Sequence, residues 1–102
     1  MKLIAVTGII EYRDDIAALF KKAHVPVFSE AETTGHKNMA HANLQDNWFG
    51  KVGEHFQSVL FFSFTNEEYA YQLMELVNEH NMQTELSYPI HAYIVAVERF
   101  SE

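Results

Sequence analysis

Cysteine is absent from this sequence, and basic residues are scarce. Its 102 residues include 7 Lys or Arg against 14 Asp or Glu, which gives a formal net charge of −7 at pH 7 with neutral histidines. Without cysteine the chain can form neither a disulfide framework nor a thiolate metal site. The shortage of positive charge argues against nucleic acid and anionic lipid as partners, because both are bound by clustered Lys and Arg.

Long hydrophobic runs are also lacking. The longest apolar stretch, near residues 59–64, is far shorter than the roughly 20 residues that a membrane-spanning helix needs. The N-terminal stretch MKLIAVTGIIEYRDD has one Lys and a short apolar run before its charges, and it has no small-residue cleavage site. We therefore interpret it as a strand and not as a signal peptide, and we expect a cytoplasmic protein without direct membrane insertion.

The chain does have an aromatic-rich globular composition. Hydrophobic residues make up 48% and aromatic residues 14% of the sequence. Its length predicts a single domain covering residues 1–102. For so small a domain, this aromatic content indicates that part of the apolar surface faces a partner subunit.

The periodicity of apolar residues predicts the order strand, helix, strand, insert, strand, helix, strand. The predicted strands are residues 2–7, 25–32, 55–65 and 90–100, and the predicted helices run over about 14–22 and 65–80. This order predicts an α+β, ferredoxin-like βαββαβ fold, with a four-stranded antiparallel sheet and two helices on one face. Its uncovered face is expected to be buried by oligomerisation.

Local signals predict where these elements begin and end. Gly8 is expected to end the first strand, and the run from Thr33 to Gly35 is expected to end the second. Thr65 and Glu68 form a predicted capping box for the second helix. Asn81 is a predicted left-handed C-cap, and residues 82–89 are expected to form a loop or a short edge strand.

The insert at about 36–54 carries a group of soft-metal ligands. His36, Met39 and His41 lie within residues 36–41, and His55 follows where the insert returns to a strand. Imidazole and thioether suit copper, and imidazole also suits zinc and nickel. The insert therefore predicts a metal site, which His55 can join if the flanking strands pair. The alternative, favoured by the lack of a fixed ligand spacing, is that these side chains are simply solvated.

Other candidate residues have a functional and a structural interpretation. Trp48 and Phe49 are either an apolar tip that binds a partner protein or part of the chain's own packing. His91 on the last strand is either a ligand or, as is more common for a strand histidine among aromatic residues, a structural group. We interpret His24 and His80, at helix ends, as structural or surface residues.

No catalytic constellation stands out. Glu30, Glu32 and Glu98 could form a carboxylate cluster, but strand positions facing solvent are the simpler interpretation. The chain has no cysteine and no G-x-S-x-G motif, so nucleophilic catalysis has no candidate residue. The sequence therefore predicts a protein that is not an enzyme.

The order of elements and one short motif resemble the PII-like signal-transduction proteins. The stretch SEAETTGHK, residues 29–37, resembles the family's Thr-Glu-Val-Lys-Gly-Phe-Gly-Arg-Gln, with Glu30 and Gly35 identical. His36 and Lys37 stand where the family has Arg and Gln. The insert occupies the place of the family's long T-loop. This resemblance implies a homotrimer that binds an effector between subunits and regulates a transporter or enzyme through that loop.

The resemblance also has a clear departure. Family members that bind ATP or ADP carry Gly-Asp-Gly-Lys before the last strand and Arg residues after it. The corresponding segment here is QTELSYPIHAY, and Arg99 is the only basic residue in the tail. A phosphate cradle needs close backbone approach and positive charge, and this segment has neither. The chain resembles equally the related divalent-ion-tolerance proteins, which also lack the phosphate loop.

The resulting functional prediction is a regulatory trimer. Its effector, a transition-metal ion or an adenine nucleotide, would bind at Gly35, His36, Lys37 and His91 in clefts between subunits. An alternative is a ferredoxin-like monooxygenase, some of which bind haem with the residue types of Asn43, Trp48 and His55. A trimer that binds no effector is a further alternative.

Overall fold

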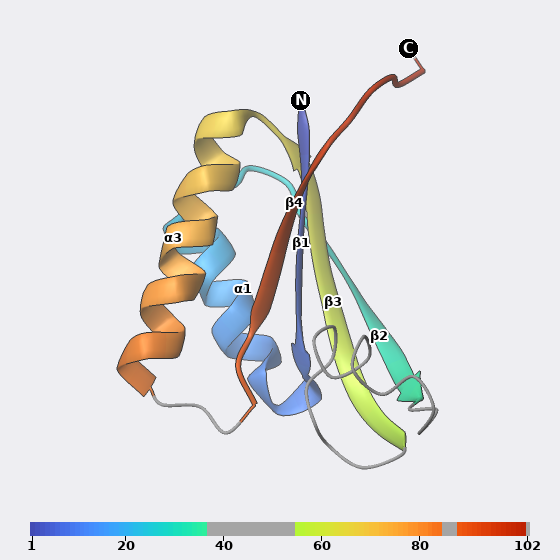
Figure 1. The fold of residues 1–102 in the computed structure, drawn as a ribbon, viewed down its shortest axis with the longest axis vertical. Coiled ribbons are helices and arrows are strands. Elements are labelled where there is room, and N and C mark those ends of the chain that lie inside the picture. Colours follow the sequence, from blue (N-terminus) through green and yellow to red (C-terminus); the bar gives the residue numbers. More distant parts are fainter. Residues whose placement is uncertain (37–54, 85–87, 102) are drawn as a thin grey trace.

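The computed structural model describes residues 1–36, 55–84 and 88–101, with only the backbone of His55. Within these residues four antiparallel strands form one sheet in the order β2-β3-β1-β4, and the two α-helices pack on the same face of it (Figure 1). The strands are β1 (Lys2–Ile9), β2 (Ser29–His36), β3 (His55–Thr65) and β4 (His91–Ala96). A short 3-10 turn, η1 (Ile10–Tyr12), leads into α1 (Arg13–Lys22), and α3 (Glu67–Thr84) follows β3. The α+β, ferredoxin-like fold is as predicted.

The core fills the space between the sheet and the two helices. Alternate residues of the central strands β1 and β3 face the helices, and the apolar stripes of α1 and α3 cover them. The fully buried side chains of this layer are Ile4, Val6, Ile16, Phe20, Val59, Phe61, Leu73, Val77 and Ile90. Burying each of these large side chains contributes about 1.5–3 kcal/mol. The buried residues of both helices therefore lie at helical spacing, on the side that faces the sheet.

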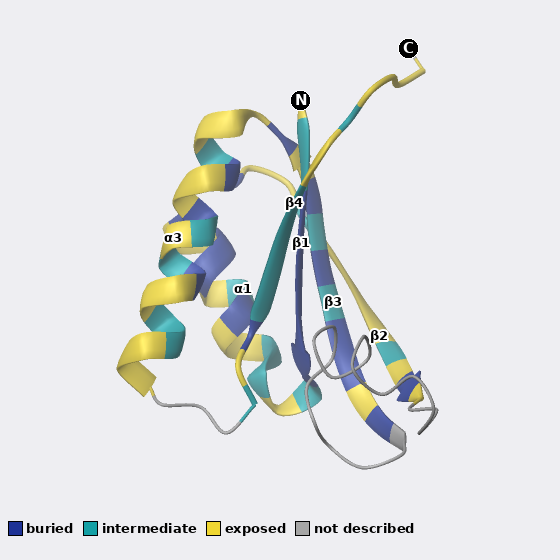
Figure 2. Ribbon diagram, viewed as in Figure 1, coloured by how far each residue is buried: buried dark blue, intermediate teal, exposed yellow. Residues whose placement is uncertain are grey.

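The sheet face that points away from the helices, here called the open face, carries no formal charge. By register and strand alternation it comprises Leu3, Ala5, Thr7, Ile9, Ser29, Ala31, Thr33, Gly35, Phe56, Ser58, Leu60, Phe62, Phe64, His91, Tyr93 and Val95. None of these is Asp, Glu, Lys or Arg. Phe64 and Val95 are 58% and 49% exposed, so part of this apolar surface is uncovered in the isolated chain (Figure 2).

Helix α1 ends in a left-handed turn at His24. Its φ of 62° is the only positive value among the described non-glycine residues. The N–H of His24 donates to the Lys21 carbonyl at 3.0 Å, and the N–H of Val25 donates to the Phe20 carbonyl at 3.2 Å. This pair of bonds is a Schellman motif, which satisfies two of the helix's last carbonyls. The predicted helix end before Pro26 is confirmed, with His24 as its turn residue.

Two strands extend further than predicted. Strand β1 passes through Gly8 to Ile9, and β2 runs from Ser29 to His36 instead of 25–32. The prediction that Thr33 to Gly35 would end β2 is wrong, because these residues continue the ladder with β3. Residues 25–28 precede the strand, and there the Ser63 hydroxyl donates to the Val27 carbonyl at 2.5 Å.

The boundaries of α3 also differ from the prediction. Its N-terminus is capped by Asn66, whose Oδ1 accepts the Tyr69 N–H at 3.0 Å, and not by a box of Thr65 and Glu68. The helix continues to Thr84, so Asn81 lies inside it and is not a left-handed cap. Strand β4, at His91–Ala96, is shorter than the predicted 90–100.

Candidate functional site

The two ends of the insert meet in a continuous strand ladder. Strand β2 ends at His36 and β3 begins at His55, and these residues are direct Cα partners. The neighbouring pair is Gly35 with Phe56. Directly opposed residues on antiparallel strands have Cβ atoms about 4.5–5.5 Å apart. The pairing on which the predicted role of His55 depended is therefore present in the backbone, and His36 is exposed.

Gly35 is where this end of the ladder is most tightly packed. A Cβ atom added to Gly35 would lie 2.2 Å from the Phe56 ring, far inside van der Waals contact. Phe56 is 7% exposed, so its ring covers the Gly35 backbone. A glycine at this position lets an aromatic side chain cross the neighbouring strand, a known way of stabilising glycine in sheets. This packing fixes the place at which the insert leaves the sheet.

Hydroxyl groups gather on the open face just below this end. Thr33 is directly opposite Ser58, and Thr7 is opposite both Leu60 and His91. Thr7 and Ser58 are fully buried. Among the residues that the structure describes, neither the Oγ of Ser58 nor the Oγ1 of Thr33, both buried, has a hydrogen-bond partner. Leaving a buried hydroxyl unpaired costs about 1–3 kcal/mol, so this pair of groups is able to accept a polar ligand or water.

His91 lies at the start of β4 on the same open face. Burial desolvates its imidazole and lowers the pKa below the ordinary value of 6.5. The ring is therefore neutral at pH 7 and keeps a lone pair, which is the form that binds metals and accepts hydrogen bonds. His91 has the protonation state that its predicted role as a ligand requires.

His36 and His91 are not brought together within one chain. His36 ends β2 and His91 begins β4, and these strands form opposite edges of the sheet with β3 and β1 between them. Three strand spacings separate the edges by about 14 Å. Strand alternation also puts His36 on the helix-covered face and His91 on the open face. The predicted effector residues can share one site only if two copies of the chain contribute to it.

The two glutamates of β2 both pair with one arginine from the start of α1. Nε of Arg13 lies 3.1 Å from Oε2 of Glu30, and its Nη2 pairs with Oε1 of Glu32. All three side chains are partly exposed, so the pairs contribute little free energy but hold the edge strand against α1. Glu98 lies beyond the end of β4. The interpretation of Glu30 and Glu32 as exposed strand residues is confirmed, with Arg13 as a partner that sequence reasoning missed.

Several predicted site residues lie outside the described part of the chain. They are Lys37, Met39, His41, Asn43, Trp48 and Phe49. Among the residues that the structure describes, no three His, Cys, Asp or Glu side chains are grouped so as to hold a metal ion. Of the predicted metal ligands His36, Met39, His41 and His55, the structure describes His36 and the backbone of His55. It pairs these two residues across the ladder.

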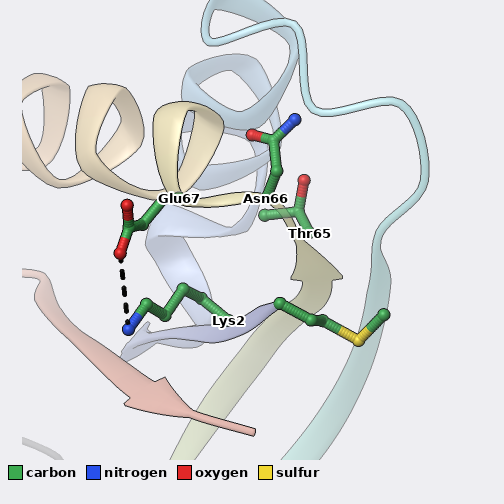
Figure 3. A pocket seen from close by; sticks show the side chains of 5 residues that line it. Lys2, Thr65, Asn66 and Glu67 are labelled. Carbon is green, nitrogen blue, oxygen red and sulfur yellow. Dashed lines mark ion pairs between the residues drawn. The ribbon is translucent and has the colours of Figure 1, made fainter.

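A hollow at the other end of the sheet was not predicted. It has a volume of about 530 Å³ and is lined by Met1, Lys2, Thr65, Asn66 and Glu67. The Lys2 ammonium lies 3.6 Å from Oε1 of Glu67 across it (Figure 3). The opposite charges that line this hollow are already paired with each other. No sequence signal pointed to it, because it arises from the pairing of Lys2 with Thr65.

Comparison with known proteins identifies the fold. The sequence matches no protein-family model, and no curated protein is similar to it. A PII-like signaling protein from Thermus thermophilus is similar in structure, with TM-score 0.61 and 15% identity over 91% of this chain and 82% of that one. CutA1 from Pyrococcus horikoshii has TM-score 0.61 and 18% identity over 100% of this chain and 88% of that one.

A DUF3240 family protein from Shewanella baltica is similar over 99% of this chain and 93% of its own, with TM-score 0.55 and 13% identity. At such identities the likeness is one of fold, and it agrees with the resemblance predicted from the sequence. No helix in the described residues combines the length and the apolar character needed to cross a membrane.

Proposed function

We propose that this chain is a PII-like regulatory protein whose effector is a transition-metal ion bound at the base of the insert. In this proposal three copies form a homotrimer, and the insert controls a partner protein, either a membrane transporter or an enzyme. Trp48 and Phe49 in the insert would bind that partner. The chain itself would carry out no catalysis.

The observation that carries the proposal is the direct pairing of His36 with His55. Opposed residues on antiparallel strands project their side chains from the same face, close enough for two imidazoles to share one ion. Met39 and His41 lie on the insert within a few residues of this pair and would complete the coordination. Because Met39 and His41 lie on the insert, binding a metal would hold that part of the insert against the paired end of the ladder and change the order of the segment.

A metal suits this chain better than an adenine nucleotide. Gly35, the motif residue closest to the site, has its backbone covered by the Phe56 ring and so offers no open cradle for a phosphate. The chain carries a net charge of −7, which attracts cations and repels nucleotides. A neutral His91 from a neighbouring copy would be available as an additional ligand, because the cleft would join opposite edges of two sheets.

The homotrimer in this proposal is supported by the chemistry of the open face. None of the sixteen open-face positions of the four strands carries a charge, although 21% of the residues in the chain are charged. Such an absence would rarely arise by chance, and the cores of protein interfaces are depleted of charge in the same way. Exposed Phe64 and Val95 lie on this face. Burying it against other copies would remove apolar surface from water without desolvating any ion.

The test is a thermal-shift series on metal-free protein with Zn(II), Cu(II), Ni(II), Co(II), Cu(I), ATP and ADP. We expect one metal to raise the melting temperature, since a ligand at 100 times its dissociation constant stabilises by about 2.7 kcal/mol. The shift should be lost in His36→Ala and in His55→Ala. It should persist in His24→Asn, which removes an exposed histidine outside the site and tolerates the left-handed turn.

Three results would contradict the proposal. One is a shift with ATP or ADP only, which would make the effector a nucleotide. The second is a metal shift that survives in the His36→Ala/His55→Ala double variant, which would put the metal elsewhere. The third is the absence of any shift across the series, which would leave the insert without an effector.

A further inference from the structure

We propose that the outer side of α3 is a docking surface for a segment of a partner protein that is rich in Lys and Arg, with Tyr71 and Met82 as the apolar anchors of the contact. This inference deepens the proposed function, because it rests on a regulated partner protein and states the chemistry that the partner presents. The docking surface includes neither the insert nor a metal ion.

One stripe of α3 points away from the sheet. Its residues are all exposed, and they lie within about 100° of one another around the helix axis. They are Glu68, Tyr71, Glu75, Asn78, Glu79 and Met82, here called the outer stripe. Leu73 and Val77, which are buried, lie on the opposite side of the helix. The outer stripe is therefore free of contacts with the chain's own core (Figure 2).

The outer stripe carries charge of one sign. Helix α3 has several glutamates and no Lys or Arg. Glu75 and Glu79 are separated by one helical turn, a spacing at which like charges repel each other and destabilise the helix. Among the residues that the structure describes, neither these two nor Glu68 has an ion-pair partner. Local rules of this kind are broken mainly where function requires it, and a cationic partner would relieve the repulsion.

Two large side chains distinguish the outer stripe from an ordinary solvated helix face. Tyr71 is 50% exposed and Met82 is 79% exposed. They are about three turns apart, or about 16 Å along the axis, and lie almost in line. The Tyr71 hydroxyl donates to Oε1 of Glu67 at 3.4 Å, which holds the ring along the helix. A tyrosine ring attracts Arg and Lys, and a methionine packs against apolar surfaces of irregular shape.

The chemistry of the outer stripe favours a basic protein segment over other partners. Nucleic acid and anionic lipid would be repelled by the glutamates and by the net charge of −7. A second copy of this chain would bring the same carboxylates face to face. In the described part of the chain no three His, Cys, Asp or Glu side chains are grouped to hold a metal ion, so the spread glutamates suit an extended partner.

The outer stripe is accessible in the proposed trimer. Both α-helices pack on the sheet face opposite the open face, so a trimer joined through the open face leaves α3 outside (Figure 1). Asn81 bonds to Ile90, the residue before β4, so the C-terminal end of α3 lies where β4 begins. Figure 1 shows this end of α3 at the end of the sheet where β2 finishes and the insert begins. A partner that contacts the insert can therefore reach Glu79 and Met82 as well.

Peptide binding to the metal-free full chain tests the glutamates. The probe is a fluorescent amphipathic peptide of Lys and Leu at helical spacing, and its binding is followed by fluorescence anisotropy. We expect Glu75→Gln/Glu79→Gln to weaken binding about tenfold, because both carboxylates pair with the peptide. The matched control is Glu11→Gln/Glu98→Gln, which removes two charges from exposed positions outside α3 and should bind as tightly as the natural chain.

A second pair of variants tests the apolar anchors. Tyr71→Ala/Met82→Ala should weaken binding of the Lys and Leu peptide about tenfold, because it removes the apolar contacts and keeps every glutamate. A peptide with Ser in place of Leu should bind this variant and the natural chain equally. Circular dichroism should be the same for both proteins, since Tyr71 and Met82 are exposed and alanine favours a helix.

The outcomes separate this inference from the proposed metal site. Equal weakening by the α3 pair and by the control pair would reduce the binding to net charge and overturn the docking surface. Failure of the natural chain to bind the Lys and Leu peptide would overturn it too. Neither result affects metal binding at His36 and His55, which is read from the melting temperature. Peptide binding as expected without any metal shift would keep the docking surface and remove the metal effector.

Discussion

Gly35 has no side chain, and this allows the Phe56 ring to pack on its backbone at the end of the sheet where the insert begins. The sequence marked Gly35 as part of a motif and as a strand breaker, because glycine has no side chain to pack. In the structure the Phe56 ring covers its backbone, and the strand continues to His36. The sequence therefore singled out Gly35, but the reason for a glycine there is its neighbour Phe56 on β3. Only the strand register identifies Phe56 as that neighbour.

The packing of Gly35 predicts that even an added methyl group destabilises the fold. Gly35→Ala would place its Cβ 2.2 Å from the Phe56 ring, and the ring is too buried to move freely. We expect the free energy of unfolding to fall by about 1–3 kcal/mol, measured by urea denaturation of the metal-free protein.

Two comparisons make this prediction specific. Gly8→Ala should cost less, because its Cβ would come closer than ordinary van der Waals contact only to the Cδ1 end of Ile16, at 3.1 Å. Adding Phe56→Leu to Gly35→Ala should recover part of the loss, so that the two changes are not additive. If Gly35→Ala unfolds at the same urea concentration as the natural chain, the ring does not pack on this glycine.

At the scale of elements, helix and strand cores were predicted well and their ends were not. The apolar stripes of α1 and α3 determine which residues face inward, because a helix repeats every 3.6 residues whatever its partner. The end of α3 instead depends on a contact with a distant residue. Asn81 was predicted to be a left-handed cap, but its side chain accepts the Ile90 N–H at 3.0 Å and donates to the Ile90 carbonyl at 2.8 Å.

These two bonds predict a structural role for Asn81 in joining α3 to the residue before β4. Asn81→Ala should lower the free energy of unfolding by about 1–3 kcal/mol, because it leaves both backbone groups of the buried Ile90 without their partner. Urea denaturation measures the loss. Asn78→Ala, an exposed change on the same helix, should stay within about 0.5 kcal/mol of the natural chain. Equal effects of the two substitutions would contradict the role.

At the scale of the whole molecule, the charged side chains of the sheet all lie on one of its two faces. Lys2, Glu30 and Glu32 all lie on the face that the helices cover, where they pair with Glu67 and Arg13. The open face has no charged residue and carries exposed aromatic and aliphatic groups. The aromatic content of the sequence suggested such a surface, but the strand register was needed to find it.

A charge introduced on the open face should separate the copies without unfolding them. Val95 is 49% exposed there, so Val95→Glu can keep its carboxylate in water in a monomer but would bury it in a trimer. We expect a fall in molecular mass by light scattering with an unchanged circular dichroism spectrum. Met82→Glu on α3 adds the same charge elsewhere and should keep the natural mass. A trimeric Val95→Glu protein would rule out the open face as the interface.

The sequence by itself determined the order of the elements and the ferredoxin-like fold. These follow from the spacing of apolar residues along the chain, which needs no knowledge of what each element packs against. It also located both ends of the insert, His36 and His55. Only the tertiary structure decided that these two residues are paired, that Arg13 pairs with both Glu30 and Glu32, and that His91 lies at the opposite edge. Strand register and the strand order β2-β3-β1-β4 arise from contacts between distant segments, and local periodicity does not encode them.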